Sequence, residues 1–109
     1  MTTPSDVLRA AAQHMEDRAS TYDSPGGERS MGKAINMLNT LTGEPTLTVE
    51  QGWLFMAILK MVRSQQGGFK MDNYEDLAAY AALAAEEAYG MRVHAPAAGE
   101  VTPLDGRNT

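Results

Sequence analysis

Two cationic side chains interrupt an otherwise apolar stretch of the sequence. Residues 53–62 read WLFMAILKMV, and Lys60 and Arg63 are three positions apart, which places them on one face of a helix. A buried charge without an opposite charge is costly, so both cations are expected to face anionic groups. Lys and Arg also bind the oxygens of phosphate and carboxylate groups. The pair is therefore a candidate for binding an anionic ligand.

Acidic and amide side chains that could face these cations follow a Gly67-Gly68 turn. Asp72, Asn73 and Asp76 open the next predicted helix. Tyr80 lies one helical turn beyond Asp76 on the same face. An antiparallel hairpin would bring Asp76 back towards the cations and form a cluster of Lys60, Arg63, Asp72, Asn73, Asp76 and Tyr80.

Three interpretations of this cluster stay open. In the first, the charges line a ligand pocket, and in the second they take part in catalysis. In the third they are structural: the cations extend their aliphatic stems along apolar surface. In that case Asp72 is only an N-cap and Asp76 is only a salt-bridge partner.

Arg18 and Tyr22 form a second candidate group. They end the first predicted helix, on the side of Ala11 and Met15, just before a Pro-Gly-Gly loop. As ligand-binding residues they would form a pocket rim, with Arg18 for phosphate or carboxylate and Tyr22 for stacking or a hydroxyl contact. As structural residues, Arg18 would fix the loop and Tyr22 would pack over the helix end.

Helical segments separated by Gly-, Pro- and Ser-rich breaks must position these residues, and no strand is predicted. A first helix is expected over about residues 4–21, because Thr3 and Asp6 match a capping box. A second is expected over about 28–41, and it ends where Gly43 suits a left-handed position.

Two further helices form the central hairpin. Thr48 with Gln51 predicts a capping box at the start of the third helix, which should end near Gln66. Asp72, with an acid three residues later, predicts a similar start for the fourth. Seven alanines let this last helix approach its neighbours closely, and Gly90 is expected to end it.

The predicted fold is an all-α, compact four-helix bundle over residues 1–90, followed by a flexible tail over 91–109. The third helix is apolar nearly all round, which is typical of a helix buried on most sides. About 90 residues offer little surface to cover it, so pairing into a homo-oligomer is expected. A monomer with this helix at its centre is the alternative.

Composition excludes several classes of protein. The 109 residues contain no cysteine and only two histidines, which excludes disulfides, thiolate sites and a histidine-rich metal site. The net charge of -5 argues against direct binding to nucleic acid. No apolar run reaches membrane-spanning length and no signal peptide is evident, so no membrane association is expected and the expected location is the cytoplasm.

Three motifs carry a resemblance to a known family. They are RASTYDSP at residues 18–25, LKMVR at 59–63 and DN-x-x-DLAAYA at 72–81. The sequence resembles a small, helical, largely phage-encoded family of unknown function, which is distantly similar to the MazG-like all-α nucleotide pyrophosphohydrolases. The resemblance covers roughly residues 8–88. It implies a four-helix, often oligomeric fold and a link to nucleotide metabolism.

The metal-binding pattern of the MazG-like enzymes is incomplete in this sequence. Active members bind magnesium through a Glu-Glu-x-x-Glu run on one helix and a Glu-x-x-Asp run on the next, because a hard cation prefers oxygen ligands. The second predicted helix carries no inward acid pair. Asp72 and Asp76 match only part of the second run, so neither a catalytic residue, a metal ligand nor a resident cofactor is assigned.

The sequence therefore favours a phage-type small helical protein that binds a nucleotide or related phosphorylated small molecule without strong catalysis. Its expected location is the host cytoplasm if it is phage-encoded. One alternative is a Mg-dependent nucleotide pyrophosphohydrolase, with Asp72, Glu75 and Asp76 as ligands of the metal. The other is a phage accessory inhibitor that contacts a host or defence protein, a role that suits a small acidic chain.

Overall fold

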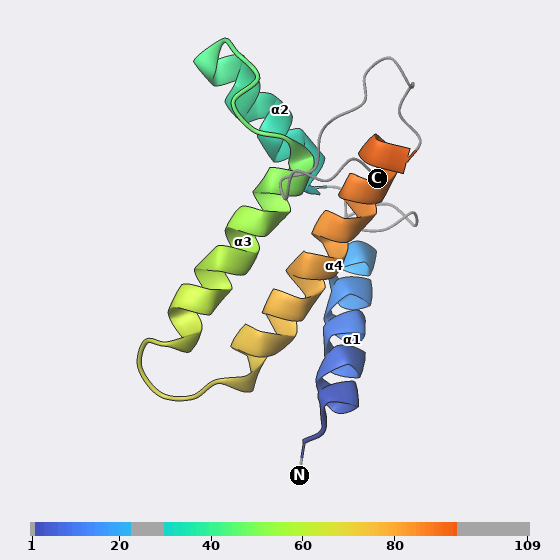
Figure 1. Ribbon diagram of the computed structural model, residues 1–109, viewed down its shortest axis with the longest axis vertical. Coiled ribbons are helices and arrows are strands. Elements are labelled where there is room, and N and C mark those ends of the chain that lie inside the picture. The colour runs from blue at the N-terminus through green and yellow to red at the C-terminus, as the bar shows by residue number, and fades with distance from the viewer. Residues whose placement is uncertain (1, 23–29, 94–109) are drawn as a thin grey trace.

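Four α-helices form the part of the chain that the computed structural model describes, residues 2–22 and 30–93 (Figure 1). These ranges contain no strand, which confirms the all-α prediction. None of these helices combines the length and the apolar character that crossing a bilayer requires. In chain order the helices are α1 (Pro4–Tyr22), α2 (Ser30–Thr42), α3 (Val49–Ser64) and α4 (Met71–Val93).

The helices pack around α4. Helices α3 and α4 form an antiparallel hairpin, and α1 packs on α4 from another side. Helix α2 contacts the N-terminal end of α3 and extends away from the other helices (Figure 1). The result is a helical bundle in which three helices share the main packing and the fourth is joined at one end.

Capping boxes fix the starts of two helices as the sequence predicts. The Thr3 N–H donates to Asp6 Oδ2 at 3.1 Å, and the Asp6 N–H donates to Thr3 Oγ1 at 3.2 Å. The first of these contacts, with a further hydrogen bond from Arg9, lowers the pKa of the Asp6 carboxyl below its ordinary value. At α3, Thr48 and Gln51 exchange the equivalent bonds at 3.0 and 3.1 Å. Each bond satisfies an N–H that the helix itself leaves without an acceptor.

Glycines in the left-handed region shape the turns on both sides of α3. Gly43 follows α2 with a φ of +80°, and its N–H donates to the Asn39 carbonyl at 3.0 Å. Gly67 has a φ of +66° in the turn between α3 and α4. A side chain would be strained at either position, so both turns depend on glycine.

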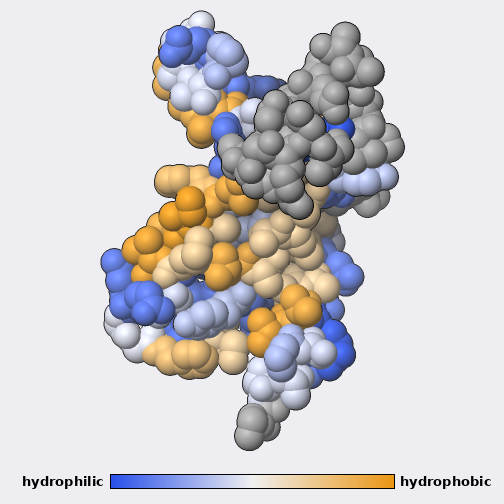
Figure 2. All heavy atoms as spheres, viewed as in Figure 1, coloured by the Kyte–Doolittle hydropathy of each residue, from blue (hydrophilic) through white to orange (hydrophobic). Residues whose placement is uncertain are grey.

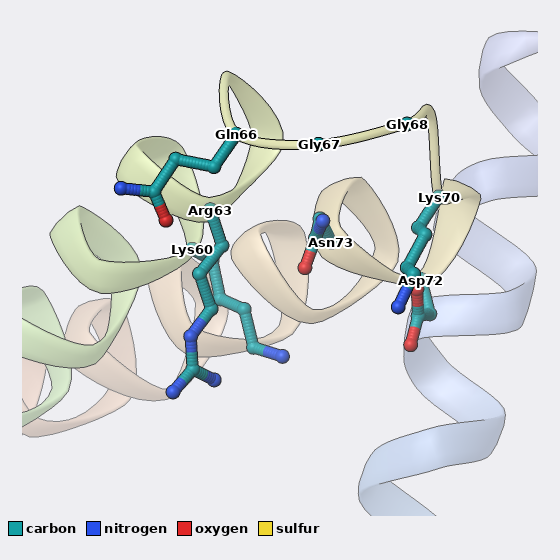
Figure 3. A pocket seen from close by; sticks show the side chains of 8 residues that line it. All are labelled: Lys60, Arg63, Gln66, Gly67, Gly68, Lys70, Asp72 and Asn73. Atoms are coloured by element: carbon teal, nitrogen blue, oxygen red, sulfur yellow. The ribbon is translucent and has the colours of Figure 1, made fainter.

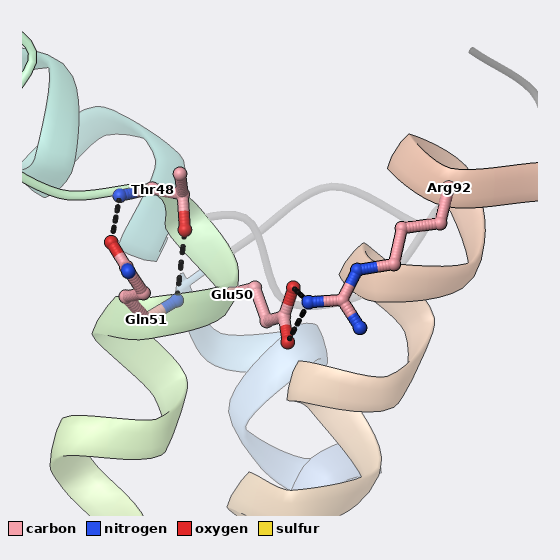
Figure 4. Close-up of polar contacts among 4 residues, drawn as sticks. All are labelled: Thr48, Glu50, Gln51 and Arg92. Atoms are coloured by element: carbon pink, nitrogen blue, oxygen red, sulfur yellow. Dashed lines mark hydrogen bonds and ion pairs between the residues drawn. The ribbon is translucent and has the colours of Figure 1, made fainter. Parts of the chain in front are cut away.

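Helix α4 differs from its predicted bounds at both ends. It begins at Met71, and its first turn has no capping box at Asp72. It continues through Gly90 to Val93, because Arg92 reaches back to α3 and donates to both oxygens of Glu50 at 3.2 and 3.3 Å (Figure 4). The prediction that Gly90 ends the helix is therefore wrong, and residues 91–93 are helix rather than tail. The rest of the predicted tail, and the expected start of the second helix at residue 28, lie outside the described residues.

The core at the hairpin is small and rich in alanine. Trp53 of α3 packs with Leu83 and Ala84 of α4. The remaining buried apolar side chains in the described part of the chain are those of Ala11, Ile35, Ala57 and Ala79. Gly52 lies directly against α2, because a Cβ at this position would be 2.5 Å from the sulfur of Met31.

Within one chain, α3 is buried on one side and not on most sides, although its sequence pattern is typical of a helix buried on most sides. Its buried residues are Gly52, Trp53 and Ala57. Phe55 is 62% exposed and Ile58 is 53% exposed. A single layer of neighbours covers one side of α3 and leaves the opposite side in solvent.

Candidate functional site

The hairpin brings Asp76 to Lys60, as the sequence predicts. Lys60 Nζ lies 2.8 Å from Asp76 Oδ2, and both side chains are mostly buried, with 13% and 16% of their surface exposed. The pair links α3 to α4 close to the hairpin loop, four residues before the last residue of α3 and five residues after the first residue of α4. A charge pair that is this well shielded from water is screened little by salt.

Arg18 of α1 joins the same group. Its Nη1 lies 3.8 Å from Asp76 Oδ1, so the carboxylate sits between two cations from different helices. The Arg18 guanidinium also lies 5.3 Å from the centre of the Tyr80 ring, in a cation–π arrangement. Tyr80 in turn stacks on Trp53, with ring centres 5.6 Å apart. We call Arg18, Lys60 and Asp76 the ion cluster.

A pocket of about 470 Å³ lies at the turn between α3 and α4, next to the ion cluster. In Figure 3, Lys60 and Arg63 project from α3 to the same side, and the start of α4 lies across from them. We call this hollow the turn pocket, and it is lined by Lys60, Arg63, Gln66, Gly67, Gly68, Lys70, Asp72 and Asn73.

The turn pocket is predominantly cationic. Its lining holds three cations (Lys60, Arg63, Lys70) and one acid (Asp72). Within the described ranges no ion pair engages Arg63 or Lys70, and both side chains are exposed. Asn73 is buried, at 8% exposure, and supplies an amide to the pocket wall. Two exposed cations beside a buried amide can bind an anionic group.

An aromatic pair stands beside the turn pocket. Phe69 lies between Gly68 and Lys70 in the chain, and it stacks on Tyr74 of α4 with ring centres 6.1 Å apart. Phe69 is 73% exposed, which is unusual for a large aromatic side chain. Its ring is therefore accessible for stacking with a planar group.

The structure divides the predicted site residues between two neighbouring groups. Arg63, Asp72 and Asn73 line the turn pocket, while Arg18, Asp76 and Tyr80 belong to the ion cluster and its aromatic contact, and Lys60 belongs to both. Asp72 is exposed, and within residues 2–22 and 30–93 no ion pair joins Arg63 to an acid, so the expectation that both cations face anionic groups holds for Lys60 only. Tyr22 is the last residue of α1, and its side chain lies outside the described part of the chain.

Sequence reasoning missed part of the turn pocket. Lys70 and Gln66 were not assigned, although Lys70 is a third cation placed directly between a glycine turn and a helix start. Phe69 was not assigned either, and an apolar residue in a polar turn was the signal that could have found it. The predicted pair of cations was thus only one wall of the pocket.

The carboxylates that a metal site would use are engaged elsewhere. Glu75 Oε1 lies 2.8 Å from Nε2 of His14 on α1, and Asp76 is held by the ion cluster. Across the described residues, no three His, Asp or Glu side chains are grouped so as to hold a metal ion. His14 thereby links α1 to α4.

Fold and site together define a small all-α protein with a cationic pocket at the turn of a helical hairpin. The chain belongs to the DUF6378 family, a domain of unknown function that it matches over residues 6–88. The match spans the ion cluster and the turn pocket. No curated protein and no solved structure matches the chain.

Proposed function

We propose that the protein binds a nucleotide or a related phosphorylated small molecule in the turn pocket, without strong catalysis. The observation that carries the proposal is the pair of exposed cations, Arg63 and Lys70, at a pocket that also contains Lys60. Cations that neither pair with acids nor support the fold are available to a ligand. Phosphate is the anion that such groups, with Arg63 as a fork-shaped donor, bind well.

Phe69 supports a nucleotide over inorganic phosphate. A base can stack on an exposed aromatic face, and such stacking contributes about 1–3 kcal/mol where it has been measured in nucleic-acid complexes. Phe69 is the chain neighbour of Gly68 and Lys70, which both line the turn pocket, and the proposal places the base on its exposed ring. In this arrangement phosphates contact the cations, Asn73 donates from the pocket wall, and the base lies on Phe69.

The motif resemblance provides a context for the proposal. Likeness to small phage-encoded helical proteins, and more distantly to MazG-like enzymes, supports a role in nucleotide metabolism. The proposal includes a cytoplasmic location, in the host cell if the protein is phage-encoded, because free nucleotides are present there. The hydrolase alternative has no observation in its favour, since Glu75 and Asp76 already contact cationic or histidine partners. The accessory-inhibitor alternative draws no specific support from the turn pocket.

Calorimetric titration with nucleoside triphosphates and with pyrophosphate tests the proposal. We expect Arg63→Gln/Lys70→Gln to weaken nucleotide binding by about tenfold or more, because two charge-assisted contacts are lost. Phe69→Ala should weaken nucleotide binding while leaving pyrophosphate binding unchanged. Binding should also fall as the salt concentration rises.

Lys33→Gln is the matched control, because Lys33 is an exposed cation on α2, outside the turn pocket. It changes the net charge in the same direction and should leave binding unaltered. The proposal is overturned if wild-type protein binds none of these ligands, or if the double variant binds as well as the control. Nucleotide hydrolysis that depends on magnesium would instead support the hydrolase alternative.

A further inference from the structure

A broad apolar stripe covers the solvent side of α3. Its members are 36% to 62% exposed and recur at helical spacing: Leu54, Phe55, Ile58, Met61 and Val62. They lie opposite the buried Trp53 and Ala57. The stripe contains no charged residue, because Lys60 faces Asp76 and Arg63 lines the turn pocket.

Helix α4 extends this apolar surface. Ala81 and Ala85 of α4 are exposed, and their spacing of four residues puts them on one side of the helix. Figure 2 shows apolar side chains along α3 beside the paler, alanine-rich surface of α4, on one face of the molecule. We call the stripe of α3 together with these two alanines the hairpin face.

The described part of a single chain buries little apolar surface apart from the hairpin face. Among the described residues, seven apolar side chains are buried, and four of the seven are alanines. Ile35, Trp53 and Leu83 are the three larger ones. Burial of apolar surface is the main favourable term in folding, and small domains have little of it to spare. A partner on this face would add to the small amount of apolar surface that the described residues bury.

We propose that the hairpin face binds a second copy of this chain. The exposed side chains offer on the order of 600 Å² per chain, and a standard interface buries about 800 Å² per partner including its polar rim. An isologous twofold contact would place α3 and α4 of each copy in one four-helix bundle. Ala81 and Ala85 would let the facing helices approach closely.

Charge and availability favour a second copy over another protein. The net charge of -5 lies outside the hairpin face, so two acidic chains can meet there without close repulsion. The face carries no charge that would select an oppositely charged partner. A partner that covers this face has to be present wherever the chain is made. A second copy of the chain always meets that condition.

The test is the mass in solution by light scattering after gel filtration. Wild-type protein at micromolar concentration should have twice the chain mass of 11.8 kDa. Ile58→Glu should reduce the mass to one chain, because it places a charge in the middle of the face. Leu8→Glu is the matched control, since Leu8 is 62% exposed on α1 and lies outside the face, and it should keep the double mass.

A mild substitution covers the case in which Ile58→Glu does not fold. The chain has no cysteine, so Ile58→Cys and Leu8→Cys each introduce one thiol. A short bis-maleimide should join two copies of the Ile58 variant and not of the Leu8 variant. The proposal is overturned if the wild-type protein is a single chain. It is also overturned if both cysteine variants behave alike, or if Ile58→Glu folds and keeps the double mass. None of these measurements depends on ligand binding in the turn pocket, so they test the dimer separately from the proposed function.

Discussion

At the scale of single residues, Asp76 is the group on which three helices depend. Its two oxygens face Lys60 from α3 at 2.8 Å and Arg18 from α1 at 3.8 Å, while Asp76 itself lies on α4. Removing either cation leaves the carboxylate with the other one. Removing the carboxylate leaves two shielded cations facing each other. The three side chains should therefore contribute unequally to stability.

Asp76→Asn should lower the free energy of unfolding by about 2–3 kcal/mol, whereas Lys60→Gln should lower it by about 1 kcal/mol. The reason is that a charge left without its partner loses solvation as well as attraction. Urea unfolding followed by circular dichroism measures both values. Arg9→Ala, which removes an exposed pair with Asp6, is the control and should change little. Equal losses for the two main variants would contradict the assignment of Asp76 as the centre of the cluster.

The sequence predicted a contact between two side chains correctly where both lie on the same helical hairpin. Lys60 and Asp76 lie on two helices that a short glycine turn joins, so helical spacing alone brings them together. Arg18 was placed in a separate group because nothing local fixes how α1 packs on α4. Lys70 in the pocket wall and Phe69 beside the pocket were missed because the turn was treated only as a connection between two helices.

At the scale of elements, capping chemistry predicted the starts of α1 and α3 but failed at both ends of α4. Thr3 and Thr48 begin their helices with the expected hydrogen bonds, and Gly43 follows α2 in the left-handed region. Gly90 misled the prediction, because α4 gains more from its alanine run and from the Arg92–Glu50 contact than it loses at one glycine. After Gly43, by contrast, Pro45 cannot continue a helix.

Two helical glycines should respond to alanine in opposite directions. Gly90→Ala should raise the free energy of unfolding by about 0.5 kcal/mol, because no atom lies near the new methyl group and alanine favours the helix. Gly52→Ala should lower it by about 1 kcal/mol, since the methyl group would lie 2.5 Å from the Met31 sulfur and 3.0 Å from Ile35 Cδ1. Thermal and urea unfolding compare the two. A gain at Gly52 would mean that α2 does not hold its position on α3.

At the scale of the whole molecule, the hydrophobic pattern predicted four helices but not which of their apolar surfaces would be buried against one another. The third helix was expected to be too apolar for about 90 residues to cover, with a helix at the centre of a monomer as the alternative, and one side of it is exposed, as at Ile58. Helix α2 has an apolar spacing similar to that of a core helix, but Leu41 is 84% exposed and Ile35 is its buried residue. Periodicity shows which side of a helix is apolar. It does not show whether the chain has enough other helices to cover that side.

Unequal packing should appear as unequal local stability. Helix α2 is held by Ile35 and by its contact with Gly52, whereas α4 is packed on both sides by α1 and α3. Amide hydrogens of α2 should therefore exchange at least about tenfold faster than those near Ala79 in the middle of α4. Hydrogen exchange measured by NMR resolves the two helices in one sample. Ile35→Ala should speed exchange in α2 further while leaving the amides near Ala79 unchanged. If exchange in α2 is as slow as in α4, or if Ile35→Ala speeds both helices equally, the four helices open as a single unit and α2 is not peripheral.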